Sequence, residues 1–337
     1  MAEAPSAPAG RRFRIPPALQ YPLKFALGGA AIWALIHSGN LEPQRVARAF
    51  GEHPGLIAAA LATYLILVLA AAWARWFLLL RLAGLKPGPG RVFSLFMIGL
   101  FFNSMIPGGT GGDLVKGYYL FKEHKEEHKV TALATIAMDR FIGLYALLLV
   151  ALGMAALNAD LWKDSAMLRA NGLFYAGVFA AFTAAVAFFF SPWSGSLLGG
   201  KPGASPSRLD RIPGGRFLRA LAAALGVYRE RPLSLVFPLL LGISVDLGLI
   251  LLYYFSAGAL GLELPLRVHG FVVPMLTMIN GIPISPSGVG VGEAAGKVVY
   301  GNLGVASGGE VLVLVHLVIL AVSMLGAPFY LLYRARK

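Results

Sequence analysis

The stretch "NSMIPGGTGGDLVKG", residues 103–117, interrupts an apolar segment with a proline, five glycines, an aspartate and a lysine. The apolar run that leads into it, residues 92–106, is too short to cross about 30 Å of hydrocarbon as a helix. A second stretch, "NGIPISPSGVGVGEAAGK" at 280–297, ends the short apolar run 271–282 in the same way. Irregular backbone persists at membrane depth only where protein buries it or where it lines a wet cavity. We therefore predict two re-entrant helical hairpins, over residues 92–122 and 268–303.

The rest of the chain has the composition of a helical membrane protein. Of its 337 residues, 57% are hydrophobic and 13% are charged. We predict an all-α polytopic membrane protein with about six full transmembrane helices, at residues 22–38, 55–80, 131–157, 172–190, 234–258 and 310–333. The formal charge of +13 lies mostly in the N-terminal tail and in loops beside apolar runs, so we expect no nucleic-acid partner. The absence of cysteine excludes disulfides and thiolate chemistry.

Lysine and arginine gather in alternate loops, and the positive-inside rule places such loops in the cytoplasm. The basic segments are the tail 1–21, the loop 81–91, the linker 192–233 and the C-terminus. Few basic residues lie in the loops at 39–54, 158–170 and 259–267. We therefore expect an integral protein of a prokaryotic cytoplasmic (inner) membrane, with both termini in the cytoplasm.

The predicted elements form two halves with the same order: span, span, hairpin, span. The first membrane repeat covers 22–157, and the second begins with an outer loop and span at 158–191 and continues over 234–337. Each half has an odd number of complete crossings, so the second half is inserted upside down relative to the first, as in many transporters. The linker 192–233 is expected to carry an interfacial helix on the anionic inner leaflet.

The first breakpoint has the residues of an anion site. Glycines permit close backbone approach, and Asp113 or Thr110 is placed to cap the helix that continues through Lys116. Free amides at such a helix start attract an anion, and Lys116 adds a formal charge. The substrate-binding candidates here are Asn103, Pro107, Gly108, Gly109, Thr110, Gly111, Gly112, Asp113 and Lys116.

The second breakpoint repeats this design. Prolines end one half-helix, hydroxyls and glycines open the next, and Glu293 stands where Asp113 stands in the first half. Its candidates are Pro283, Ser285, Pro286, Ser287, Gly288, Gly290 and Glu293. The competing interpretation is that the glycines only let helices pack closely, as small residues do in membrane bundles.

Other ionisable residues lie within predicted spans, where they are costly and tend to be functional. Arg140 is a candidate phosphate ligand because its planar fork matches phosphate oxygens. The candidates for proton or ion coupling are Asp139, Asp246 and Glu293. For Asp139 and Glu293, a buried ion pair that fixes a hairpin is an equally good interpretation.

Two further side chains have simpler interpretations. Arg75 lies near the inner end of its span, and we expect it to snorkel to the interface. His316 is expected to be a hydrogen-bonded histidine inside the bundle, with a role as a proton relay as the alternative. The loop "HKEEH" at 124–128 fits a zinc pattern but offers no third ligand, so we expect no metal and no cofactor.

The chain resembles the family of the lysylphosphatidylglycerol synthase transmembrane region, a family of flippase-like integral membrane proteins. The resemblance rests on "NSMIPGGTGGDLVKGYYL" at 103–120, "MDRFIGL" at 138–144 and "PISPSGVGVGEAA" at 283–295. It implies that lipids or lipid-linked carriers are moved between leaflets. Aminoacylating members carry an additional soluble transferase domain, whereas this sequence ends a few residues after its last predicted span. We therefore expect no lysine transfer here.

The sequence thus predicts a flippase that moves an anionic phospholipid or polyprenyl phosphate by alternating access, and that is not an enzyme. Its partners are expected to be membrane lipids, and self-association into a homo-oligomer stays open. The main alternative is a membrane-embedded lipid-modifying enzyme resembling a glycosyltransferase. A proton-coupled small-solute carrier or an ion channel comes third.

Overall fold

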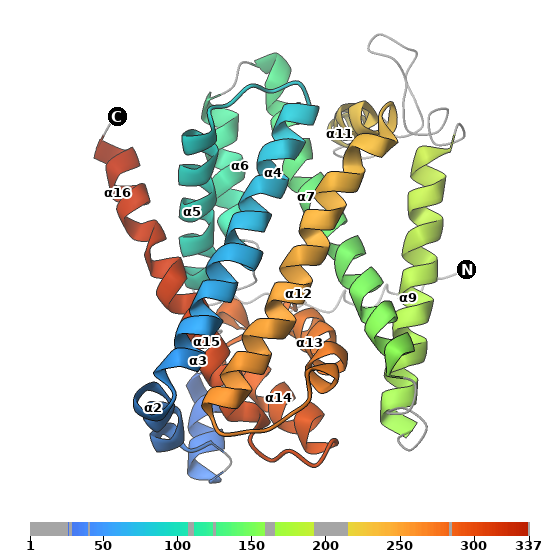
Figure 1. The fold of residues 1–337 in the computed structure, drawn as a ribbon. Helices are drawn as coiled ribbons and strands as arrows, with labels where there is room; N and C mark the ends of the chain where they lie inside the picture. The colour runs from blue at the N-terminus through green and yellow to red at the C-terminus, as the bar shows by residue number, and fades with distance from the viewer. Residues whose placement is uncertain are drawn as a thin grey trace, which may run out of the picture.

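The structure is a computed structural model of the chain, and it describes residues 26, 29–39, 41–106, 111–123, 126–158, 166–191, 215–282 and 285–335. All regular secondary structure in these residues is helical (Figure 1). This confirms the predicted class, an all-α polytopic membrane protein.

Four segments of the described chain are long and apolar enough to cross a membrane: Pro54–Leu82, His128–Leu157, Pro232–Ala259 and Gly308–Tyr333. They confirm four of the six predicted spans. The first segment consists of α3 (Pro54–Thr63), the π-helix η1 (Tyr64–Ala70) and α4 (Ala71–Leu82), and the second lies in α7 (Glu126–Leu157). The third consists of the 3-10 turn η3 (Pro232–Leu235) and α12 (Val236–Ala259). The fourth lies in α15 (Gly308–Met324) and α16 (Gly326–Ala335).

The other two predicted spans are described in part. The helix α9 (Ala166–Phe190) has 25 residues, and its apolar stretch Gly172–Phe188 is shorter than the four segments above. Residues 29–37 are helical, while most of the predicted span N-terminal to them lies outside the described residues. The number of complete crossings therefore stays a prediction.

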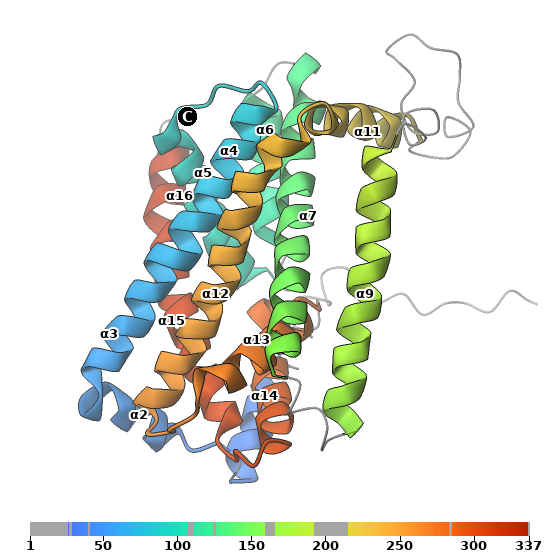
Figure 2. The same cartoon turned by 45° about the vertical axis from the view of Figure 1, so that its right-hand side comes forward.

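Both predicted hairpins are pairs of short helices. The first is α5 (Pro89–Met105) and α6 (Gly111–Glu123), of 17 and 13 residues. The second is α13 (Leu266–Asn280) and α14 (Val291–Gly301), of 15 and 11 residues. All four are shorter than the roughly 20 residues that cross a bilayer. In Figures 1 and 2, α5 and α6 lie at the upper end of the bundle, and α13 and α14 lie at the lower end.

Proline and glycine set several helix ends. Proline occupies the first turn of α5, where its missing N–H costs nothing. Gly84 follows α4 with φ +81°, a left-handed conformation that favours glycine, and its N–H binds the carbonyl of Arg81. These local signals, which are visible in the sequence, explain where α4 ends and where α5 begins.

The helix α12 is the centre of the bundle, packed against α3, α4, α7 and α13. The main apolar core lies between α12, α13 and α15, around Leu252, Leu276 and Val315. Besides the hairpin helices, the described chain has α2 (Pro43–Glu52) and α11 (Gly215–Arg229) outside the predicted spans. Figure 2 shows α11 lying across the end of the bundle, beside the ends of α9 and α12. The sequence predicted a helix in this linker, and residues 192–214 lie outside the described part.

Candidate functional site

The two hairpins meet at their tips. The Ser287 hydroxyl, from the turn η4 (Pro286–Gly288), donates a hydrogen bond to the backbone carbonyl of Asn103 at 3.3 Å. Ser287 has φ +49°, the one positive φ outside glycine among the described residues. Such a conformation costs about 1–3 kcal/mol and tends to persist at functional positions. The breakpoints that the sequence singled out are therefore in contact.

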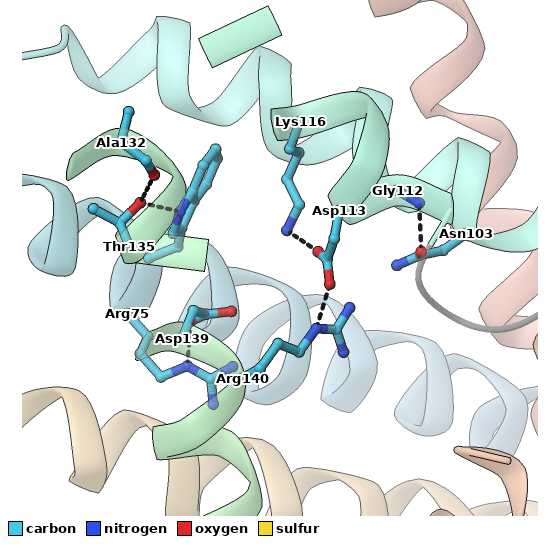
Figure 3. A network of polar contacts seen from close by, with 10 residues as sticks. Arg75, Asn103, Gly112, Asp113, Lys116, Ala132, Thr135, Asp139 and Arg140 are labelled. Atoms are coloured by element: carbon cyan, nitrogen blue, oxygen red, sulfur yellow. Dashed lines mark hydrogen bonds and ion pairs between the residues drawn. The ribbon is translucent and has the colours of Figure 1, made fainter. Parts of the chain in front are cut away.

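The amide of Asn103 also closes the first hairpin. Its Oδ1 accepts a hydrogen bond from the Gly112 N–H at 2.7 Å (Figure 3). The sequence predicted that this amide N–H is free to bind an anion, and that prediction is wrong for Gly112. The reason is that the Asn103 side chain, nine residues earlier, already accepts this N–H at the start of α6.

Asp113 is the centre of the first half of the site. It is the third residue of α6, and its carboxylate lies between two cations (Figure 3). Lys116 Nζ is 2.8 Å from Oδ1, and Arg140 Nε donates to Oδ2 at 2.5 Å. The Arg140 side chain is 54% exposed, whereas those of Lys116 and Asp113 are 7% and 12% exposed. The structure thus brings together three of the residues that the sequence proposed as ligands: Asp113, Lys116 and Arg140.

Lys116 is held by cation–π contacts as well as by its ion pair. Its Nζ lies 4.9 Å from the ring centre of Trp76 and 5.8 Å from that of Phe96, within cation–π range. A Cβ on Gly99 would lie 2.9 Å from the lysine stem, so this glycine gives Lys116 the room to cross α5. Lys116 is therefore a buried positioning group for Asp113.

A second ion pair joins α4 and α7. Arg75 Nε donates to Asp139 Oδ1 at 2.7 Å, and both side chains are 10% exposed (Figure 3). The expectation that Arg75 snorkels is wrong, because a buried carboxylate holds it inside the bundle. For Asp139, this pair favours the structural interpretation. Asp246 on α12 is also buried and lies within electrostatic range of Arg75.

The guanidinium of Arg75 fits between two glycines. A Cβ on Gly143 of α7 would lie 3.2 Å from its Nη1, and a Cβ on Gly242 of α12 would lie 3.3 Å from the same atom. The ion pair therefore links three spanning helices.

Glu293 is the centre of the second half of the site. Like Asp113, it is the third residue of the hairpin's second helix, and it contacts the span that follows. Its Oε2 accepts the Gly290 N–H at 2.5 Å, and its Oε1 lies 2.7 Å from Nδ1 of His316 on α15. Glu293 is 1% exposed. His316 is hydrogen-bonded, as expected, but the sequence did not predict its partner.

A cavity of about 430 Å³ lies beside the contact between the hairpins. It reaches from the end of α5, at Ser104 and Met105, to Ser287, Glu293 and His316. Most of its lining is apolar, and the remaining lining residues are Gly29, Ile32, Val289, Val313, Leu317, Ile319 and Leu320. A mainly apolar pocket with a few convergent polar groups is typical of a small-molecule site.

The other predicted site residues divide into two groups. Gly111 and Gly288 lie at the tips, Pro286 begins η4, and the Ser285 hydroxyl is buried without a hydrogen-bond partner among the described residues. Outside the described residues lie Pro107, Gly108, Gly109, Thr110 and Pro283.

Fold and site together define a class: a polytopic α-helical membrane protein in which two helical hairpins meet beside a cavity. Residues 22–327 match the family model described as "Lysylphosphatidylglycerol synthase TM region", and the chain belongs to that family. This confirms the resemblance seen in the sequence and connects the protein with membrane lipids. Neither the curated proteins nor the solved structures compared with the chain contain a match.

Proposed function

We propose that this protein moves an anionic lipid, a phospholipid or a polyprenyl phosphate, between membrane leaflets by alternating access. The lipid is not chemically changed, so the proposal includes no enzyme activity. Both termini face the cytoplasm in this proposal, because lysine and arginine gather in the two terminal tails, the loop 81–91 and the linker 192–233, and such segments stay in the cytoplasm.

The observation that carries the proposal is the contact between the hairpins. The α5–α6 hairpin and the α13–α14 hairpin enter from opposite ends of the bundle, and Ser287 binds the Asn103 carbonyl where they meet. Transporters with inverted repeats place their substrate sites where broken helices meet at the midplane. Separation of these tips would open the site to one leaflet or the other.

Arg140 is the headgroup ligand in this proposal. Its half-exposed guanidinium is bound by Asp113, and a phosphate group can replace that carboxylate with the same fork geometry. Asp113 therefore acts as an internal counter-ion while the site holds no lipid. Lys116, buried against Trp76, keeps Asp113 in place when the exchange occurs.

The cavity supports a lipid rather than a small polar solute. Its lining is mainly apolar, and its few polar groups are Ser104 and Ser287 near the hairpin tips and the Glu293–His316 pair. A hydrocarbon chain fits such a lining without leaving polar groups unpaired.

Reconstitution into liposomes tests the proposal. The purified protein is incorporated with fluorescent phosphatidylglycerol, phosphatidylcholine or a polyprenyl phosphate, and a membrane-impermeant quencher measures lipid movement to the outer leaflet. We expect faster movement of an anionic lipid and at least a tenfold loss in Arg140→Gln, about 1.4 kcal/mol. The matched control is Arg81→Gln at the exposed end of α4, which should keep the wild-type rate.

Three outcomes contradict the proposal. Movement of no lipid overturns the transport function, and chemical modification of the lipid moves the assignment to the enzyme alternative. Equal rates in Arg140→Gln and wild type overturn the headgroup assignment alone.

A further inference from the structure

We propose that the Glu293–His316 pair is a proton-binding site that couples proton movement to movement of the anionic headgroup. This inference rests on the proposed lipid transport and adds its driving ion. A purely structural hairpin does not need a buried Glu–His pair at the cavity, and the inference gives this pair a chemical role.

The hydrogen bonds leave one position free for a further proton. Oε2 of Glu293 accepts the Gly290 N–H, and Oε1 is in hydrogen-bond contact with His316 Nδ1. In the proposed unprotonated pair, the ionised carboxylate accepts from the Nδ1–H of a neutral imidazole. The second nitrogen, Nε2, is the position where one further proton can bind.

His316 faces the proposed substrate space. It lines the cavity together with Ser287 and Glu293, and among the described residues its polar contact is through Nδ1. A proton on Nε2 therefore changes the charge of the pair from −1 to 0 at the wall of the cavity.

No permanent cation among the described residues is paired with Glu293. On α12, Tyr253 lies within electrostatic range of the carboxylate. On α13, Oδ1 of the neutral Asn280 lies beside Gly292. The edge of the His316 ring lies beside the same glycine. From α5, Ser104 and Met105 line the same cavity. The charged residues of α2 lie at the far end of α15, where Arg45 Nη1 donates to the Ser307 hydroxyl at 2.5 Å.

The acids of the two hairpins have different partners, and this difference assigns the proton to the second hairpin. Asp113 is paired with two cations, Lys116 and Arg140. Glu293, its positional counterpart, has a histidine in place of those cations, and histidine is the side chain that titrates near neutral pH. The pair is therefore the titratable half of an otherwise fixed charge arrangement.

The coupling follows from charge. An unprotonated pair leaves a buried negative charge beside the cavity and repels a phosphate, whereas protonation of Nε2 removes this repulsion. Proton and anionic headgroup therefore favour each other's binding, and the linkage is reciprocal. A proton gradient would then drive the lipid from the acidic side of the membrane toward the alkaline side.

Liposomes with an imposed pH gradient test this inference. Phosphatidylglycerol movement is measured by the quencher assay, and proton movement is measured with a pH-sensitive dye inside the vesicles. We expect lipid movement to follow the gradient, and lipid affinity to rise by up to about tenfold per pH unit on acidification, as for one proton bound with each headgroup. His316→Gln and Glu293→Gln should both abolish this pH dependence.

His269→Gln is the matched control. His269 is also a buried imidazole, but it binds the Tyr300 hydroxyl through Nδ1 at 2.9 Å and is not among the cavity-lining residues. This variant should keep the pH dependence. Nitrogen NMR of labelled histidine, with His316→Gln to assign the signal, should show protonation of His316 when phosphatidylglycerol is added.

The outcomes separate the two proposals. Lipid movement that ignores the pH gradient, with no proton movement and no change in the His316 signal, overturns the proton site and leaves lipid transport intact. An equal loss of pH dependence in the His269→Gln control overturns the assignment to this pair. No lipid movement under any gradient overturns lipid transport, and the coupling with it.

Discussion

At the scale of single residues, aspartates neutralise the cations inside this bundle. Asp139 neutralises Arg75 at 2.7 Å, and Asp113 neutralises Lys116 and Arg140. A buried charge is tolerated only when it is paired, so each of these acids is needed while its cation is present. Arg75 has a second buried acid, Asp246, within electrostatic range besides Asp139.

This second acid predicts unequal costs for breaking the Arg75–Asp139 pair. Arg75→Met leaves both Asp139 and Asp246 without their cation, and we expect it to lower the free energy of unfolding by about 3–5 kcal/mol. Asp139→Asn should cost less, because Arg75 keeps Asp246 nearby. Reversible denaturation in detergent micelles measures both values. The exposed Arg81→Gln should change stability by less than about 0.5 kcal/mol; an Arg75→Met variant as stable as Arg81→Gln would refute the role of the pair.

At the scale of elements, close helix approach shapes the first hairpin. A Cβ on Gly112 of α6 would overlap the backbone carbonyl of Gly99 on α5. The two helices therefore touch backbone to backbone, as small residues allow in membrane bundles. This contact holds Asp113, the next residue, beside Arg140. The packing and binding interpretations of these glycines are therefore compatible.

Gly112→Ala should force α5 and α6 apart. We expect a loss of stability of about 1–3 kcal/mol, as for other overpacked sites, together with slower lipid movement. Gly153→Ala in α7 is the control, since a Cβ there meets no atom within 4 Å and alanine favours the helix by about 1 kcal/mol. Thermal unfolding and the liposome assay measure the two effects. If both variants behave alike, close approach at Gly112 is not required.

At the scale of the whole molecule, the two hairpins lie at opposite ends of the bundle, and a long apolar segment follows each of them (Figure 1). Each hairpin's second helix carries an acid at its third position that contacts the following span. The contact between Ser287 and Asn103 then joins the halves at the cavity. Alternating access requires this contact to break during transport.

Cross-linking the tips should therefore stop transport. The chain has no cysteine, so Ser104→Cys with Ser287→Cys introduces one pair, and both positions line the cavity. We expect a short, cleavable cross-linker to reduce lipid movement at least tenfold and its cleavage to restore the rate. Each single cysteine variant, treated with the same reagent, is the control. Full transport by the cross-linked protein would exclude separation of the tips as a step.

Local features of the sequence predicted most of the elements. Hydropathy located four spans that the structure confirms, and proline and glycine located both hairpin breaks. The position of Asp113 and Glu293 at equivalent helix starts was also predictable, because it depends on spacing from those breaks. Residues such as Pro107 and Pro283 lie outside the described part, so the predictions for them stay untested.

The partners of the charged residues were not predictable in the same way. Arg75 meets Asp139 across 64 residues, and His316 meets Glu293 across 23 residues. A helix sequence fixes which face a side chain lies on, but not which helix will pack against that face. The sequence by itself therefore determined the helices, their breaks and the membrane class, because these depend on neighbours along the chain. Only the tertiary structure decided that Asp113, beside Lys116 of its own helix, is also held by Arg140, and that Glu293 is held by a histidine, because the Arg140 and His316 contacts depend on how distant helices pack.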